Sequence, residues 1–124
     1  INLVDDKDQI INKIKKAKTD PLAMPKNIKE LEGRPEAQNL LGIYTSLSNA
    51  SFESSLEKFA AKNFSEFKEQ LSELLVDKLT PISQEIKRLI SDQSYLDSIL
   101  LDGVEKANKI ASKKIKNIKE IVGF

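Results

Sequence analysis

Apolar residues at helical spacing run through the middle of this chain and constrain its fold more than any other feature. They recur three or four residues apart, which places their side chains on one face of an α-helix. The positions are Phe67, Leu71, Leu74, Leu75, Leu79, Ile82, Ile86 and Leu89. The pattern continues through Pro81, although proline lacks a backbone N–H and its ring crowds the preceding turn. We predict one helix of about 27 residues from Ser65, kinked at Pro81, with two shorter helices as the alternative.

Helical patterns also occupy most of the remaining sequence. We expect helices over residues 5–18, with Asp5 or Asp6 as the N-cap, from Pro35 to about Ser48, and from Ser51 to about residue 63. A last helix of about 28 residues follows Asp92 or Ser94. Strand-like alternation is lacking, and residues 21–33, which contain two prolines, have no sustained period and predict a loop. The sequence therefore predicts a single all-α domain over residues 1–124, a bundle of about five helices.

Composition limits the chemistry that the chain can perform. It contains 124 residues with no Cys and no His, which excludes disulfides, thiol nucleophiles and histidine acid–base catalysis. Adjacent carboxylates at Asp5 and Asp6 do not face each other on a helix, so capping explains them better than a metal ion. We therefore predict no catalytic residue, no metal site and no cofactor within this sequence. Because no apolar run approaches the roughly 20 residues of a membrane span and no export signal opens the chain, a cytoplasmic location is expected.

The last predicted helix has two contrasting faces. One face, expected to point inward, consists of Val104, Ala107, Ala111, Ile115, Ile118 and Val122. The other carries Lys106, Lys109, Lys113 and Lys116, which their spacing places on one stripe. A lysine stripe attracts a polyanion such as RNA, although a solvated charged surface is the commoner meaning of such a pattern. Base recognition would also need aromatic or Arg groups for stacking, and the candidates are Arg34, Arg88, Tyr44, Tyr95 and the five Phe residues.

Several spaced motifs together resemble one protein family. They are Asp5-Asp6 with Ile10, Ile14 and Lys15; Lys18-Thr19-Asp20; Asn39 to Tyr44; Phe67, Leu71, Leu79 and Pro81-Ile82; Leu96-Asp97; and Gly103 to Ala107. In this order they resemble the carboxy-terminal part of bacterial-type tryptophanyl-tRNA synthetase, a class I aminoacyl-tRNA synthetase. The resemblance covers essentially the whole chain, and one departure is Val104, where the family more usually has Ala.

The resemblance implies what the complete protein does. Such an enzyme attaches tryptophan to its tRNA with ATP and Mg²⁺, works as a homodimer, and carries its active site in an upstream Rossmann-type domain. This chain is then a helical, anticodon-binding part that is inactive by itself. Its tRNA-binding candidates are Lys106, Lys109, Lys113, Lys116 and Arg88.

Two other functions stay open at this stage. A helical protein-interaction module is one, because apolar helix faces severed from an upstream domain would favour binding or self-association. A membrane-surface role for the last helix is weaker, because its apolar face is built from Ala and Ile with Phe124 as the one aromatic. We expect no membrane partner.

Overall fold

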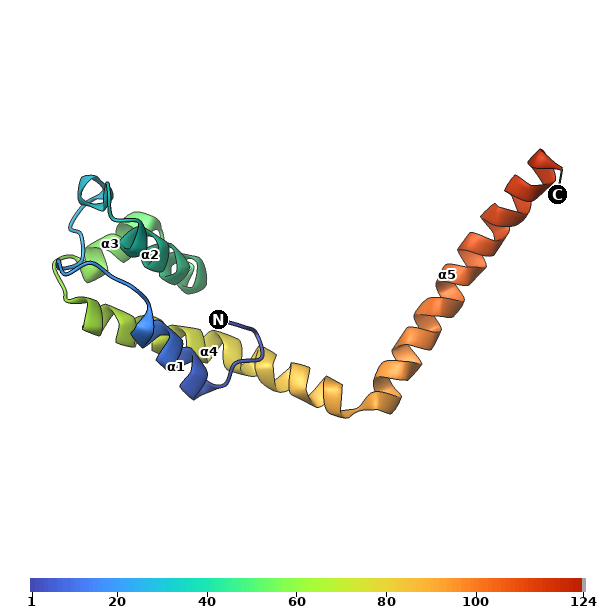
Figure 1. Ribbon diagram of the computed structural model, residues 1–124, viewed down its shortest axis with the longest axis horizontal. Coiled ribbons are helices and arrows are strands. Elements are labelled where there is room, and N and C mark those ends of the chain that lie inside the picture. The colour runs from blue at the N-terminus through green and yellow to red at the C-terminus, as the bar shows by residue number, and fades with distance from the viewer. Residues whose placement is uncertain (124) are drawn as a thin grey trace. The chain divides into compact units, whose positions relative to one another are not determined.

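The computed structural model describes residues 1–123 and is helical throughout its regular structure (Figure 1). The elements are α1 (Lys7–Lys16), the 3₁₀ helix η1 (Ile28–Leu31), α2 (Pro35–Ser48), α3 (Phe52–Phe59), α4 (Phe64–Ser91) and α5 (Gln93–Val122). The prediction of an all-α bundle of about five helices with a long basic terminal helix is confirmed, and no strand occurs in the described part of the chain. None of its helices is long and apolar enough to cross a membrane.

Two compact units make up the chain, Ile1–Gln84 and Glu85–Phe124. The boundary between them falls inside α4, so one helix contributes residues to both units. The single domain expected over residues 1–124 stays a prediction. Phe124, the aromatic residue considered for a membrane role, lies outside the described residues.

Side-chain caps explain where the helices begin. Asp6 is the N-cap of α1: its carboxylate accepts from the Gln9 backbone N–H, and the Gln9 side chain accepts from the Asp6 backbone in return. Ser51 caps α3 and Asp92 caps α5 in the same way, each accepting from a backbone N–H three residues later. These bonds satisfy donors that the first helical turn leaves without partners. The N-cap of α1 is therefore Asp6 and not Asp5, and the N-cap of α5 is Asp92 and not Ser94.

Helix α4 passes through Pro81 without interruption. It contains 28 residues, so the predicted long helix is confirmed and the alternative of two shorter helices is wrong. The kink that we expected at Pro81 is not confirmed.

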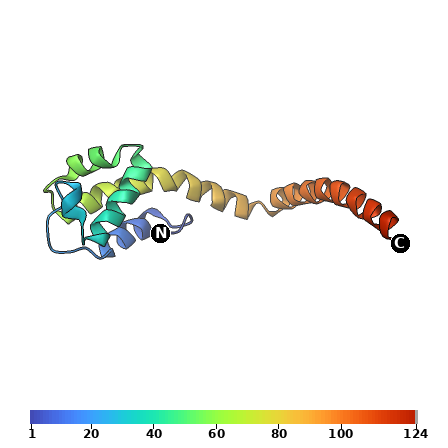
Figure 2. The same ribbon diagram turned by 90° about the horizontal axis from the view of Figure 1, so that it is seen from above.

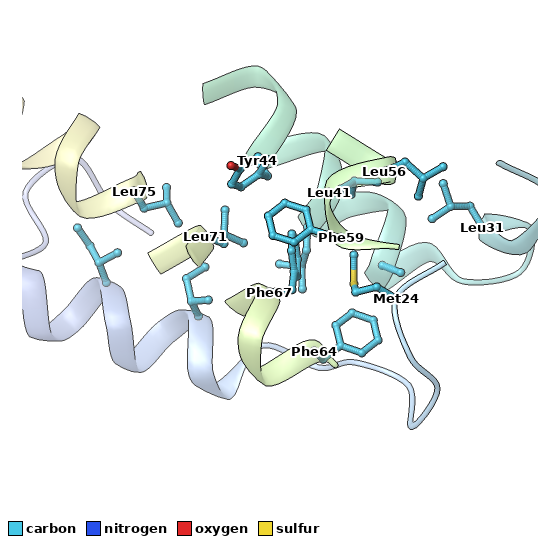
Figure 3. Packing of buried hydrophobic residues seen from close by; sticks show 14 residues of the cluster. Met24, Leu31, Leu41, Tyr44, Leu56, Phe59, Phe64, Phe67, Leu71 and Leu75 are labelled. Atoms are coloured by element: carbon cyan, nitrogen blue, oxygen red, sulfur yellow. The ribbon is translucent and has the colours of Figure 1, made fainter. Parts of the chain in front are cut away.

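The core of the first unit is an aromatic cluster between α2, α3 and α4 (Figure 3). The ring of Phe59 packs edge-on against Tyr44, with centroids 4.7 Å apart, and against Phe67, with centroids 4.8 Å apart. Phe59 and Phe67 are completely buried, and Ile10 and Ile14 of α1 belong to the same core. Figure 2 shows α1 beside the first part of α4. The ammonium group of Lys68 on α4 donates to the carbonyl of Ala17 at 2.6 Å, which satisfies an acceptor at the end of α1.

Residues 21–33 are ordered by contacts that sequence periodicity does not reveal. Met24 is buried in the core, its N–H donates to the Lys62 carbonyl at 2.8 Å, and its carbonyl accepts from the Ala61 N–H. The guanidinium of Arg34 pairs with both carboxylate oxygens of Asp20 and donates to the Ala23 carbonyl. The predicted loop therefore contains η1 and is fixed at both ends.

The face of α5 that we expected to point inward is exposed. Val104 and Ile115 are each 53% exposed, Ile118 is 58% exposed, and none of the described residues of α5 is buried. A helix buries its apolar stripe only when another element covers it, and the described part of Glu85–Phe124 supplies no such cover. The expectation of a buried face was therefore wrong for this chain.

Candidate nucleic-acid interface

Helix α5 is a long helix with well-defined ends. The Asp92 carboxylate accepts from the Tyr95 N–H at its start. Gly123 follows its last turn with φ 86°, a left-handed conformation that glycine adopts at little cost, and donates to the Lys119 carbonyl. The 30 residues between these caps hold the side chains on α5 at regular helical positions.

The basic stripe, Lys106, Lys109, Lys113 and Lys116, lies along one exposed face of α5. Lys106 forms an ion pair with Asp102, one turn earlier, at 2.6 Å. Among the described residues no ion pair forms with Lys109, Lys113 or Lys116, although Glu105 lies one turn before Lys109 and Glu120 one turn after Lys116. The three ammonium groups are therefore available to an anion outside the chain.

Arg88, in the last turns of α4, lies beside Tyr95 in the first turn of α5. Its guanidinium donates two hydrogen bonds to the Glu85 carboxylate, at 2.9 and 2.8 Å, and lies over the Tyr95 ring. The hydrogen bonds from Arg88 lower the pKa of Glu85, and those to Glu85 raise the pKa of Arg88. Tyr95 is separated from Asp102 by seven residues, which is close to two helical turns, and Asp102 pairs with Lys106. Tyr95 therefore lies on the face of α5 that carries the lysines, and Arg88 of α4 lies beside it.

The other stacking candidates lie in the folded interior. Tyr44 is buried and accepts a hydrogen bond from Lys58 at 2.6 Å, and Arg34 is 12% exposed within its pair with Asp20. Phe59, Phe64 and Phe67 belong to the core, and Phe52 is partly buried against it. Among the candidates within residues 1–123, only Arg88 and Tyr95 are exposed. The sequence already placed most of the Phe residues on apolar faces, but it did not separate the other candidates, because exposure depends on tertiary packing.

A groove of about 980 Å³ between α1 and α4 is the second candidate binding surface. Lys7, Lys15 and Lys68 line it together with Glu69, Glu73 and Asp77, around an apolar floor that includes Ile11 and Val76. Its charges are of both signs, and Lys68 already satisfies the end of α1. The groove therefore has no net charge that would select a polyanion.

The carboxylates of the described residues form no cluster of metal ligands. No group of three or more carboxylate, His or Cys side chains is arranged to hold a metal ion between residues 1 and 123. Asp5, which the sequence analysis explained by capping, instead accepts from Lys13 at 2.8 and 2.6 Å and from the Asn2 N–H. Its carboxylate is therefore a structural ion-pair partner.

Comparison with known proteins identifies relatives of the whole chain. No protein-family model matches it. It is 46% identical over 124 residues to the tryptophan–tRNA ligase of Brucella melitensis, 48% to that of Agrobacterium fabrum and 44% to that of Rickettsia conorii. All of this chain is covered in each case, but it spans only 35% of the length of the first two relatives and 37% of the third. These matches confirm the resemblance to tryptophanyl-tRNA synthetase that the sequence motifs indicated. The partial coverage is consistent with a carboxy-terminal region of such a protein.

Proposed function

We propose, on the premise that tryptophan–tRNA ligases match this chain over all of its 124 residues, that it is the carboxy-terminal helical part of such a ligase and contacts tRNA. The complete enzyme attaches tryptophan to its tRNA with ATP and Mg²⁺, acts as a homodimer and carries its active site in an upstream Rossmann-type domain. The chain by itself is inactive, because the residues that would perform this chemistry lie in that upstream domain.

The contact with tRNA is assigned to the basic stripe. The observation that carries this assignment is that Lys109, Lys113 and Lys116 lie on one exposed face and form no ion pair among residues 1–123. Lysines that neutralise phosphates release bound counterions, and the affinity then falls steeply with salt. This contribution attracts the RNA backbone without reading its sequence.

Arg88 and Tyr95 are the groups suited to contact a base. Unstacked bases of single-stranded RNA loops stack on aromatic rings and on the planes of arginine side chains. Tyr95 is 44% exposed and lies on the face of the basic stripe, with the Arg88 guanidinium beside it. A tRNA loop whose phosphates follow the lysines would therefore bring its bases near this pair.

The test is a charge reversal in the complete ligase. Lys109→Glu with Lys113→Glu should weaken tRNA binding and reduce the slope of log affinity against log salt by roughly 1.5, since each phosphate contact contributes about 0.7–0.9. Lys114→Glu with Lys119→Glu is the matched control, because these lysines lie on the same helix but off the stripe.

Binding should be measured by filter retention or fluorescence anisotropy at four or more salt concentrations. Formation of tryptophanyl adenylate, measured without tRNA, should be unchanged in both variants. Equal salt slopes for the two double variants would show that the basic stripe is only solvated surface.

A further inference from the structure

We propose that the end of α1 is a second surface that contacts the phosphate backbone of tRNA, besides the basic stripe of α5. The contact is made by the α1-end lysines, which are Lys15, Lys16, Lys18 and Lys68. All four belong to the unit Ile1–Gln84. The proposal rests on the proposed function for its ligand, tRNA, but it concerns different residues and can fail while the basic stripe is correct.

The end of α1 carries more positive charge than the helix itself needs. Carbonyl groups in the last turn of a helix lack partners and carry partial negative charge, which cations stabilise. Here Lys68 of α4 supplies the donor, because its Nζ donates to the Ala17 carbonyl at 2.6 Å and to the Lys15 carbonyl at 3.3 Å. The ammonium groups of Lys15, Lys16 and Lys18 are therefore not required to cap this end.

Acidic side chains neutralise little of this charge. Lys15 and Lys16 are exposed and form no ion pair among residues 1–123. Lys18 pairs with Glu36 at 3.2 Å, but its side chain is 87% exposed and solvent screens the pair. Like charges gathered on a small surface repel one another, and an anion that binds there relieves the repulsion.

The groove between α1 and α4 has charges of both signs, but they are separated along its length. Lys68 lies in the first turns of α4, at the end of α1. Asp77 lies nine residues later on α4, roughly 13 Å away, and Glu73 lies about halfway between them. Close to Lys68, Glu69 is the one acid among the described residues that line the groove. The groove as a whole does not select a polyanion, but its end beside the last turn of α1 is basic.

The other groups at this end suit a phosphate backbone. Thr19 and Ser65 line the groove together with Lys15 and Lys68, and hydroxyl and ammonium groups are common partners of phosphate oxygens. Phe64 also lines the groove but is buried, so it offers no exposed ring for a base to stack on. This end would therefore hold the backbone without reading bases.

The directions of the lysines favour a polyanion over a single small ion. Lys15 and Lys16 are neighbours in sequence, so their side chains leave α1 about 100° apart, and Lys18 follows the end of the helix. Such ammonium groups do not converge on one point. They are suited to successive phosphates of one strand, each contact adding to the salt dependence of binding.

Charge removal in the complete ligase tests the contact. Lys15→Gln with Lys16→Gln should weaken tRNA binding and reduce the slope of log affinity against log salt by roughly 1.5. Lys26→Gln with Lys29→Gln is the matched control, because it removes the same charge from two exposed lysines of residues 21–33. Circular dichroism should show the same helix content in both variants. Equal salt slopes for the two variants would overturn the proposal.

The α5 variant separates this proposal from the proposed function. If Lys109→Glu with Lys113→Glu changes the salt slope but Lys15→Gln with Lys16→Gln does not, only the contact at α1 is refuted. The opposite result would refute the basic stripe and support the contact at α1. A complete ligase that binds no tRNA would refute both.

Lysine acetylation read by mass spectrometry locates the contact in the unmodified ligase. Bound tRNA should protect Lys15 and Lys16, whereas Lys26 and Lys29 should react equally with and without tRNA. Inorganic phosphate, supplied at the same concentration of phosphate groups, should give no such protection. Equal protection by inorganic phosphate would assign this end of α1 to a free anion and overturn the RNA contact.

Discussion

The guanidinium of Arg88 lies over the ring of Tyr95, with 5.9 Å from its Cζ atom to the ring centroid. Arg88 comes from the last turns of α4 and Tyr95 from the first turn of α5, so the pair spans the break between the helices at Asp92. Glu85 holds the guanidinium from the other side with two hydrogen bonds. The guanidinium thus covers part of the tyrosine ring, which is still 44% exposed.

The first prediction concerns this supported ring. If Tyr95 stacks on a tRNA base, Tyr95→Ala in the complete ligase should lower tRNA affinity by roughly 1–3 kcal/mol, the range for loss of one base–aromatic stack. Tyr95→Phe keeps the ring and should bind with nearly the affinity of the unmodified enzyme. Anisotropy with labelled tRNA measures the affinity. Equal losses in both variants would point to the hydroxyl group and away from stacking.

The second prediction concerns the aromatic core. Phe67 is completely buried between Phe59 and Tyr44, so Phe67→Ala should lower the free energy of unfolding by roughly 3–5 kcal/mol. Phe52→Ala is the control because its ring is only partly buried, and its effect should be clearly smaller. Urea unfolding followed by circular dichroism gives both values. Similar midpoints for the two variants would contradict the packing described here.

The third prediction concerns acid stability. Hydrogen bonds from Arg34 lower the pKa of Asp20, and those from Lys13 lower the pKa of Asp5, each below its ordinary value of 3.8. The folded state then binds fewer protons than the unfolded state in acid. Its extra stability is fully present above pH 3.8 and is lost as the pH falls through the lower folded values.

Arg34→Gln should remove part of this pH dependence. Its unfolding free energy should be reduced at pH 6, and the difference from the unmodified chain should shrink as the pH falls through the lowered pKa of Asp20 and that carboxylate becomes protonated. Lys29→Gln removes an equal charge from an exposed lysine and serves as the control. Urea midpoints measured across this range provide the comparison. A constant difference at every pH would exclude the Asp20–Arg34 pair as its cause.

The fourth prediction concerns Pro81 in the uninterrupted α4. Proline offers no N–H to the Asp77 carbonyl, and a helix-interior proline costs about 3 kcal/mol or more. Pro81→Ala should therefore stabilise the chain by up to about 3 kcal/mol and raise its helix content slightly. Leu79→Ala, two residues away and partly buried against the core, should instead destabilise it. Thermal unfolding distinguishes the two outcomes, and a destabilised Pro81→Ala would show that the proline is needed.

The helices were predictable from the sequence because local chemistry sets their ends. Asp6, Ser51 and Asp92 each cap the helix that follows, and the apolar period of α4 carries through Pro81. Such signals act within a few residues and need no knowledge of tertiary contacts.

The features that sequence reasoning missed depend on contacts between distant residues. Met24 lies in a segment without periodicity, so its burial against the core had no local signal. Lys68 meets the end of α1 across about fifty positions of sequence, and its helical pattern marks it only as a surface residue. The apolar pattern of α5 predicted a buried face that is in fact exposed, because a pattern identifies a surface that can be buried without identifying what covers it.

The reciprocal hydrogen bonds of Met24 make two distant turns open together. The Met24 N–H donates to the Lys62 carbonyl, and the Met24 carbonyl accepts from the Ala61 N–H. The segment around Met24 therefore cannot separate from the turn at Ala61 and Lys62 without breaking both hydrogen bonds. The amide protons of Met24 and Ala61 should consequently show one common opening free energy in hydrogen–deuterium exchange, after correction for the intrinsic exchange rate of each amide. Residues 21–33 thereby belong to the same cooperative unit as the connection between α3 and α4.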